Sequence, residues 1–342
     1  MSRQTTAARR SRRLAVLVVG VSAALTLAAC TTGPDASTTT GSHASAPARP
    51  APRGVVTAKE AAAILDAYQV SNNRANARRD ARLLARVEGG QVHLQSRADY
   101  EQFPTWSKKE QAYYGSPFRY TNRTYLVPRA GSATWFAVRA QSTGSKDHAL
   151  LIFDKVGGTY KMVMGLYTDP KTPMPEVAVD RHGLAAAVDP SKPVGPLAPA
   201  QLGTAFEDLS ETGGTKSGSK LAKTTLTKEA LALYTGRDKR DDSKFDTHRF
   251  FTKPPTHPTV YALRLAGGGV LVAFPSAHTL ETMLRPAYMS SFKLNPNKEE
   301  SIYNAEKRVV ITDEFQGQAL AVLSPSGPAR VIAREYRMVD SR

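Results

Sequence analysis

The chain carries one cysteine, Cys30, in 342 residues, and this most constrains how the rest of it can fold. Because no cysteine follows Cys30, the remainder cannot form internal disulfides, thiolate metal sites or a cysteine nucleophile. The folded part must therefore be stabilised by burial of a hydrophobic core. About 290 residues are available for that core, which suits one large domain or two of moderate size.

The first 29 residues have the pattern of an export signal. Thirteen residues with five arginines and no acid precede an uncharged apolar run, Leu14–Ala29. That run is shorter than the roughly 20 residues a membrane-spanning helix needs, which favours a cleaved signal peptide over residues 1–29. Ser11-Arg12-Arg13 leaves the twin-arginine export route open beside the general secretory route.

The end of the apolar run resembles the lipobox of bacterial lipoproteins. Leu27, Ala28 and Ala29 stand directly before Cys30, in register with the signal pattern. The resemblance implies cleavage before Cys30 and a diacylglyceryl thioether on its thiol, with acyl chains such as palmitate. Two acyl chains anchor a protein stably. We therefore expect lipid anchoring at the extracytoplasmic face of the cell membrane.

Residues 30–53 are predicted to be the lipidated cysteine followed by a disordered tether. Residues 31–53 contain no aromatic residue and no Val, Ile, Leu or Met. Such a segment cannot offset the entropy of folding by burial. Folded structure is expected from about residue 54 onward.

The folded part is predicted to be α+β, in two tandem modules. In the first, residues 54–169, Thr57 and Glu60 have capping-box spacing before a helical pattern that Gly89-Gly90 ends. Four short strands follow, with a tight turn at Gly157-Gly158. A connector with six prolines, residues 170–197, precedes a second module of helices and then strands, residues 198–342.

This order resembles the nuclear-transport-factor-two-like (cystatin-like) cone, in which an N-terminal helix packs on a curved antiparallel sheet. With its lipobox and tether, the whole chain is similar to uncharacterised lipoproteins of actinobacterial envelopes. The resemblance implies a fold and a location. It carries over no catalytic residue.

An aromatic stretch, residues 103–125, is the candidate ligand-binding segment. It holds seven aromatic residues in 23, with basic residues between them. Flat rings beside cations suit the stacking of sugars or contact with an anionic polymer. Burial of the same rings in the helix–sheet contact is the competing interpretation, and the commoner fate of aromatics. The candidate ligand-binding residues are Trp106, Tyr113, Tyr114 and Arg119.

Other chemistry-bearing segments do not form complete motifs. Residues 235–257 gather acids and two histidines, but interleaved basic residues favour a solvated loop with local ion pairs over a metal site. Residues 213–220 match neither a phosphate-binding loop nor the full set of penicillin-interacting motifs. We therefore predict no catalytic residues, no metal and no cofactor.

The net charge of the chain and its expected location limit the classes of function that it can have. Without residues 1–29 the chain has 41 basic and 30 acidic residues, a net charge of +11. The expected partners are the membrane, through the anchor, and an anionic wall polymer or another envelope protein, with no nucleic acid. The sequence favours a non-catalytic binding or scaffold protein. A hydrolase or isomerase with a pocket inside one module is the alternative, and an electrostatic binder of wall polymer is a third possibility.

Overall fold

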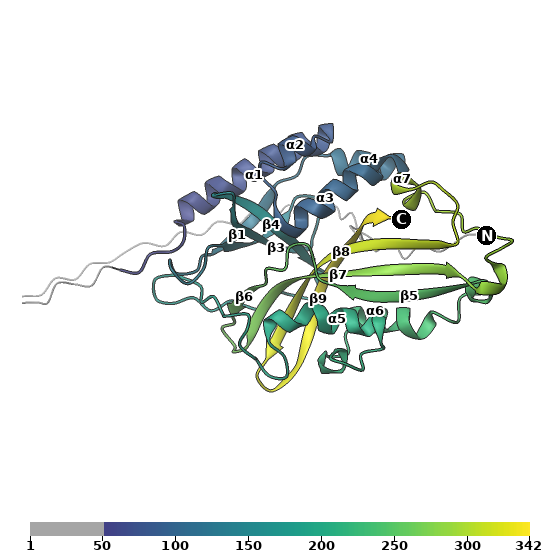
Figure 1. Ribbon diagram of the computed structural model, residues 1–342. Helices are drawn as coiled ribbons and strands as arrows, with labels where there is room; N and C mark the ends of the chain where they lie inside the picture. The colour runs from purple at the N-terminus through teal and green to yellow at the C-terminus, as the bar shows by residue number, and fades with distance from the viewer. Residues whose placement is uncertain (1–50) are drawn as a thin grey trace, which may run out of the picture.

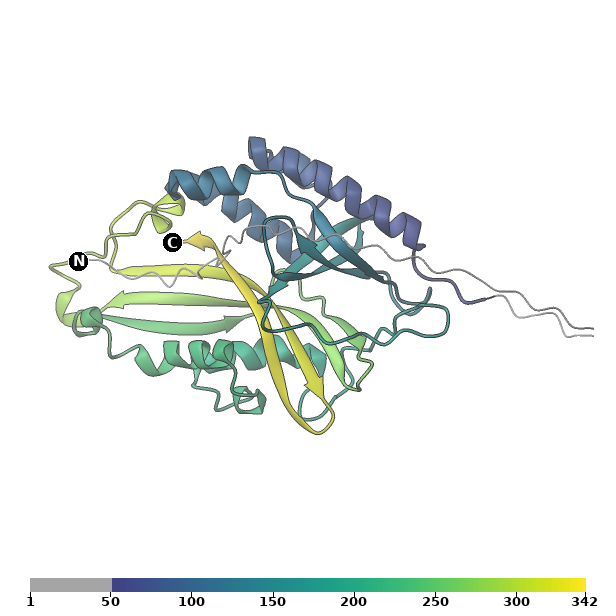
Figure 2. The ribbon, with the colours of Figure 1, turned by 180° about the vertical axis from the view of Figure 1, so that it is seen from behind.

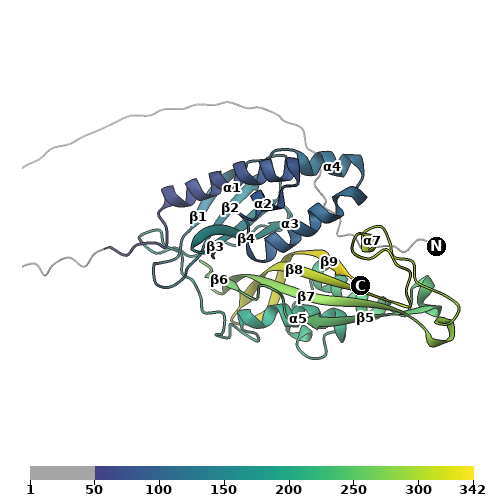
Figure 3. The same ribbon diagram turned by 45° about the horizontal axis from the view of Figure 1, so that its top comes forward.

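The computed structural model describes residues 51–342. The lipobox, Cys30 and most of the predicted tether lie outside the described residues. The described chain forms four layers: helices, a four-stranded sheet, a five-stranded sheet and a second layer of helices (Figure 3). The predicted α+β fold with two modules, each of helices on an antiparallel sheet, is confirmed.

The first module begins with a helix that starts at the predicted place. Thr57 caps α1 (Ala58–Arg78) in a capping box, in which its backbone amide donates to Glu60 Oε2 at 2.7 Å. The helix ends where Arg79 takes a left-handed conformation, and the short α2 (Ala81–Leu84) follows. The remaining helices are α3 (Gly90–Gln102) and α4 (Lys108–Gly115), with a 3-10 turn, η1 (Phe103–Thr105), between them. Gly89 is therefore the N-cap and Gly90 the first residue of a helix that the sequence pattern did not predict, and the pair does not end the first helix, as the sequence had indicated.

The first sheet is an antiparallel meander of four strands in chain order, as predicted. Gly157 and Gly158 form the tight turn between the last two strands, and both have positive φ, which glycine adopts without strain. α1 buries one face of this sheet (Figure 1). The strands are β1 (Tyr120–Leu126), β2 (Phe136–Ser142), β3 (His148–Val156) and β4 (Thr159–Thr168).

The second module places its two longer α-helices on the outer face of the second sheet, while its shortest α-helix lies near α3, where Gln102 donates to the Tyr303 hydroxyl. Strand order is β5-β7-β8-β9, and β6 pairs with β7 near the β7 N-terminus. The α-helices are α5 (Leu202–Glu211), α6 (Thr225–Gly236) and α7 (Glu300–Tyr303). The strands are β5 (Asp246–Lys253), β6 (Tyr261–Arg264), β7 (Val270–Leu284), β8 (Val310–Ser324) and β9 (Gly327–Ser341). Short 3-10 turns are η2 (Pro199–Gln201), η3 (Gly218–Lys220), η4 (Asp241–Lys244) and η5 (Pro286–Tyr288).

The acid- and histidine-rich segment 235–257 is only partly the solvated loop that the sequence predicted. Its second half is β5, an outer strand paired with β7 along its whole length. Asp246, the first residue of β5, is buried and accepts a hydrogen bond from Arg240 at 2.6 Å. The local ion pair is therefore present, and it fixes the start of a strand.

The two sheets share a hydrophobic core. Side chains from the inner face of the first sheet, such as Leu150 and Ile152, cluster with side chains of the second, such as Leu263 and Leu271. The proline-rich connector contributes to both modules, since Ala185 N donates to Val127 O and Val188 N to Ala262 O, each at 2.9 Å. Seen from behind, the sheets cross at an angle, and the β8–β9 hairpin extends beyond the first sheet (Figure 2).

Helix α3 makes a polar contact with the second sheet. Gln95 Nε2 donates to the carbonyl oxygens of Gln316 and Glu335, and Gln318 donates to Gln95 Oε1 at 2.7 Å. Gln102 donates to the Met338 carbonyl at 2.7 Å. These glutamines are buried, so the hydrogen bonds satisfy groups that water does not reach. α3 therefore joins the two modules and forms a wall of the site described next.

Candidate functional site

A pocket of about 540 Å³ lies inside the first module. Its walls come from α1, α3, the segment around α4, and β1 and β4 of the first sheet, and β8 and β9 of the second sheet add to one side. A volume of this size holds a small molecule. The pocket occupies the space between helices and sheet, where the sequence alternative of a pocket inside one module would place it.

The backbone beside β4 positions Glu88, which lines this pocket. Gly89 N donates to Met162 O, and Met162 N donates to Val87 O, both at 2.9 Å, so the turn between α2 and α3 is fixed to β4. Gly90 has a positive φ, and a Cβ there would lie 2.9 Å from Val163 Cβ. The Gly89-Gly90 pair therefore allows the close approach to the sheet that carries Glu88 into the interior.

Glu88 is a buried acid without a basic partner in the described structure. Its side chain is almost fully covered, with the residue 2% exposed. Oε1 accepts hydrogen bonds from Tyr68 at 3.1 Å and from Asn72 at 2.9 Å. Oε2 is closed to water and has no hydrogen bond of normal geometry, although the Ser96 side chain lies near enough to the carboxyl to lower its pKa. Such a carboxyl group is stable only if it stays protonated or meets a donor or cation from outside.

The electrostatics of the pocket keep Glu88 uncharged at neutral pH. Burial raises the pKa of Glu88 to about 8, and the nearby Asp99 charge adds to the rise, while Ser96, Tyr68 and Asn72 act in the opposite direction. Burial and the Glu88 charge also raise the pKa of Tyr68 well above 10. Displaced pKa values in a cleft are typical of functional sites.

Aromatic side chains form much of the remaining wall. The Tyr120 and Tyr167 hydroxyls share a hydrogen bond at 2.7 Å across β1 and β4. Phe118 packs edge-on against Tyr120, with ring centroids 5.2 Å apart. Tyr68 from α1 completes this group. A solute in the pocket would contact flat rings beside one buried acid.

Charged residues of the second sheet close one side of the pocket. Arg337 on β9 donates to Asp99 Oδ1 at 2.6 Å and to Glu335 Oε1 at 2.8 Å. Arg334 donates to Glu229 at 2.9 Å. Five acids and two arginines line the pocket, and both arginines have acidic partners. The lining is net acidic, although the chain without residues 1–29 carries a net charge of +11.

Two of the four predicted ligand-binding residues line the pocket, and the other two do not. Tyr113 and Tyr114 line the pocket. Trp106 packs against Tyr114 and Phe103, with ring centroids 5.1 and 5.6 Å away, in the competing role of a helix-contact residue. Arg119 is exposed at the start of the first sheet, and its backbone amide donates to Thr143. The aromatic stretch thus contributes both to packing and to the pocket.

Sequence reasoning did not single out Glu88. It stands in Arg-Val-Glu-Gly-Gly, where a glutamate at the end of an expected helix reads as an exposed residue. The one available signal was the glycine pair, which allows the backbone to approach another element closely. The sequence pattern indicates that the glycine pair ends a helix, and this interpretation leaves the close approach to the sheet unpredicted.

Two further segments carry residues with metal-binding or catalytic chemistry, residues 235–257 and residues 213–220. No group of three or more His, Cys, Asp or Glu side chains in this part of the chain could hold a metal ion. Segment 213–220 is organised around Asp208, whose Oδ2 accepts backbone hydrogen bonds from Lys216, Ser217 and Gly218 at 2.7 to 3.0 Å. The loop is thus held by one acid of α5.

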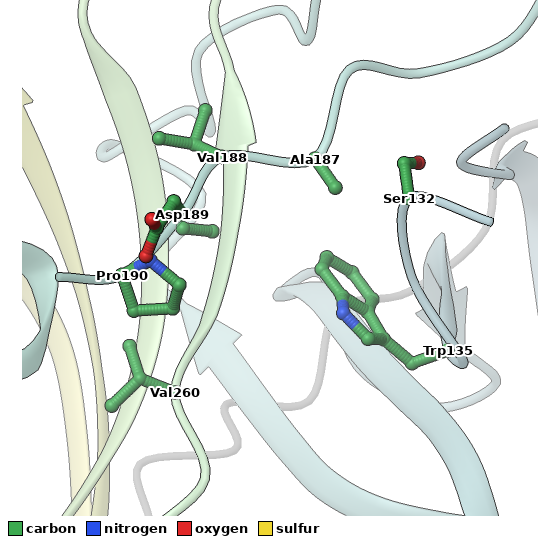
Figure 4. Close-up of a pocket in the computed structure, with 8 residues that line it drawn as sticks. Ser132, Trp135, Ala187, Val188, Asp189, Pro190 and Val260 are labelled. Atoms are coloured by element: carbon green, nitrogen blue, oxygen red, sulfur yellow. The ribbon is translucent and has the colours of Figure 1, made fainter. Parts of the chain in front are cut away.

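A second cavity, of about 470 Å³, lies at the junction of the modules and the connector (Figure 4). The Trp135 ring faces Val188, Pro190 and Val260 across it. Asp189, the one charged residue in its lining, is exposed and accepts hydrogen bonds from Ser191 within its own turn. Six of its eight lining residues are apolar, and it gathers fewer polar side chains than the pocket around Glu88.

The fold and the pocket define a two-module α+β protein with a solute-sized, acid-containing pocket in its first module. The chain belongs to the family described as Domain of unknown function (DUF8094), whose model matches residues 52–342. An uncharacterised lipoprotein of Streptomyces coelicolor is 30% identical over 345 residues, covering 95% of this chain and 93% of that protein. No solved structure matches, so the resemblance to the nuclear-transport-factor-two-like cone stays a prediction.

Among residues 51–342, no helix combines the length and the apolar character that crossing a membrane requires.

Proposed function

We propose that the protein is a lipid-anchored lipoprotein of the cell envelope that binds a small polar solute in the pocket of its first module. The Leu27–Cys30 lipobox and the similarity to a protein named as a lipoprotein support the anchor. Cys30 would carry the lipid and residues 31–53 would hold the folded part away from the head groups. The solute would bind at the outer face of the cell membrane.

The anchor is tested by the substitution Cys30→Ala. Without the thiol no thioether forms, so the protein should leave the membrane fraction or stay unprocessed. A cleaved Cys30→Ala protein that remains in the membrane fraction would disprove the lipid anchor.

The observation that carries the binding proposal is the unpaired buried carboxyl of Glu88 inside a pocket with aromatic walls. An acid in this position lowers stability, because burial disfavours its charged form. A buried acid that costs stability and has no basic partner is typical of a site with another purpose than folding. Binding requires only the pocket and its polar groups, all of which are present.

The test is a variant that fills the pocket. Gly165 lines it, and a Cβ built there meets only the Met162 and Leu151 side chains, at 3.4 Å and beyond. Gly165→Leu therefore fits the strand and places three more carbons in the pocket. Gly236→Leu is the matched control, because a Cβ at Gly236 meets nothing within 4 Å.

Envelope extract fractions should raise the melting temperature of the wild type and of Gly236→Leu. Gly165→Leu should show no such rise. If every fraction that stabilises the wild type also stabilises Gly165→Leu equally, the solute site is elsewhere and the proposal fails.

A second candidate function, proton transfer in a hydrolase or isomerase, is favoured by one observation. A carboxyl with a pKa of about 8 can give and take a proton near neutral pH, as general acid–base catalysis requires. Mass spectrometry of the bound solute before and after incubation separates the two functions. Binding predicts an unchanged solute, and catalysis predicts a product that Glu88→Gln does not form.

A further inference from the structure

The chemistry around Glu88 also indicates which class of solute the pocket takes, an inference that rests on the proposed function. A neutral, an anionic and a cationic solute would each need different side chains in the pocket lining. Three features of the lining distinguish these classes: the missing basic partner of Glu88, the net charge of the lining, and the aromatic surface beside the acid.

The second module shows how this protein satisfies a buried glutamate internally. Glu207 on α5 is 3% exposed, and its Oε2 lies 2.9 Å from Nδ1 of His278 on β7. Tyr336 donates to Oε1 of the same carboxylate. Burial would raise the pKa of Glu207, but His278 and the hydrogen bonds outweigh it, so the pKa is lowered. This acid therefore has a histidine beside it and a lowered pKa.

Like Glu207, Glu88 accepts a hydrogen bond from a tyrosine, but no basic side chain stands beside it. Tyr68 donates to Glu88 Oε1 as Tyr336 does to Glu207, yet no Lys, Arg or His among the described residues forms an ion pair with Glu88. Oε2, which has no hydrogen bond of normal geometry, belongs to a residue that lines the pocket. Glu88 therefore lines the pocket without a counterpart to the histidine that stands beside Glu207.

The rest of the lining suits a cation. The arginines of the pocket are already paired with acids, so they offer little to an anion. Asp147 and Asp169 add negative charge on the lining. The faces of Tyr and Phe rings attract cations, and ammonium groups bound among aromatic rings use this attraction.

We propose that the first-module pocket binds an organic ammonium ion, with the Glu88 carboxylate as its counter-charge. The ammonium nitrogen lies on the pocket side of the Glu88 carboxyl, and its substituents contact the pocket-lining rings of Tyr120, Tyr167 and Phe118. When the acid is protonated in the empty pocket, binding converts it to the carboxylate and releases one proton to solvent. The protein thus exchanges a proton for an organic cation.

Glu88 is the group of this pocket that changes charge near pH 8, because the groups that face it do not. Tyr68 of α1 and Tyr100 of α3 both have pKa values raised above 10 by burial. Asp99 of α3 is ion-paired with Arg337 of β9. Tyr120 of β1 and Tyr167 of β4 complete the ring of titratable neighbours and hydrogen-bond to each other.

Choline and its uncharged isostere 3,3-dimethyl-1-butanol provide the test, because their shapes match and the choline charge does not change with pH. Isothermal titration calorimetry on the full chain should show choline binding that strengthens about fiftyfold from pH 6 to pH 8 and then levels. At pH 7, titrations in two buffers of different ionisation enthalpy should show close to one proton released per choline. The isostere should bind at least tenfold more weakly at pH 8.5, with no pH dependence.

Glu88→Gln should lose the preference for choline over the isostere. Glu101→Gln, which removes the same charge from the exposed side of α3, should keep it. Failure of choline to bind at pH 8.5, equal binding of the isostere, or an unchanged preference in Glu88→Gln would overturn the ammonium proposal. The Gly165→Leu experiment is independent of this result, so a solute of another class would leave the proposed function standing.

Discussion

At the scale of single residues, Glu88 should make the stability of the protein depend on pH. Its pKa is about 8 in the folded chain and near 4.3 in an unfolded one. Between these values the unfolded chain loses its proton while the folded chain keeps it. Stability therefore falls as pH rises from about 4.3 to 8 and is constant above, as far as this group is concerned.

Glu88→Gln removes this dependence. Without ligand, the variant should match the wild type near pH 4.5 and exceed it by about 4 kcal/mol at pH 8, since each pKa unit corresponds to about 1.4 kcal/mol. Urea unfolding across this pH range measures the difference. A constant difference between pH 4.5 and 8 would mean that Glu88 is not a buried, protonated acid.

Asp208 should have the opposite dependence. Burial would raise its pKa, but hydrogen bonds from Thr212 and from three backbone amides outweigh it, so the pKa is lowered. Its contribution to stability is present above about pH 4 and is lost as pH falls through its folded pKa. Asp208→Ala leaves three backbone amides without their acceptor, of which Gly218 N is buried, and should cost about 2–4 kcal/mol at pH 7, and less at pH 3. Urea unfolding of both proteins at pH 7 and pH 3 checks this, and a loss that grows toward pH 3 would contradict it.

At the scale of elements, α3 should be the connection between the modules. Gln95→Ala leaves the buried Gln316 and Glu335 carbonyls without their donor and should cost about 2–4 kcal/mol. Hydrogen exchange should rise together in α3 and in the middle of β8. Arg97→Ala, on the exposed side of the same helix, should change neither. Faster exchange in α3 alone would show that α3 does not hold the second sheet.

Which elements the sequence predicted depends on how each buries its side chains. The first four strands were identified because hydrophobic and aromatic residues are concentrated in them, and α1 because of its capping box. The pattern did not predict α3, because the face it buries is polar, with Gln91, Gln95 and Gln102 bonded to another module. The second half of β7 was missed for the same reason, since it buries Ser276 and His278.

The candidate site was only partly predictable. The aromatic stretch was recognisable by composition, and two of its four chosen residues line the pocket. Glu88 was not recognisable, because its environment is created by contacts with Tyr68, Asn72 and β4 that are distant in sequence. A buried acid differs from an exposed one only in what surrounds it.

At the scale of the whole molecule, the two modules should unfold together. They share the core between the sheets, and Tyr261 of the second module donates to Asp154 of the first at 3.0 Å. Differential scanning calorimetry of the full chain should give one transition, with the calorimetric enthalpy equal to the van't Hoff enthalpy. Two separate transitions would show that the shared core does not couple them.

The ionisation of Glu88 tests the central claim, that the first module holds an unpaired buried acid poised for a solute. In a ligand-free sample with ¹³C-labelled glutamate carboxyl groups, an NMR titration compared with Glu88→Gln identifies the Glu88 resonance and its pKa. We predict a pKa near 8 in the empty protein and a carboxylate already at pH 6 when choline is saturating. A Glu88 pKa near 4.3 in the empty protein, as for an exposed glutamate, would contradict the account.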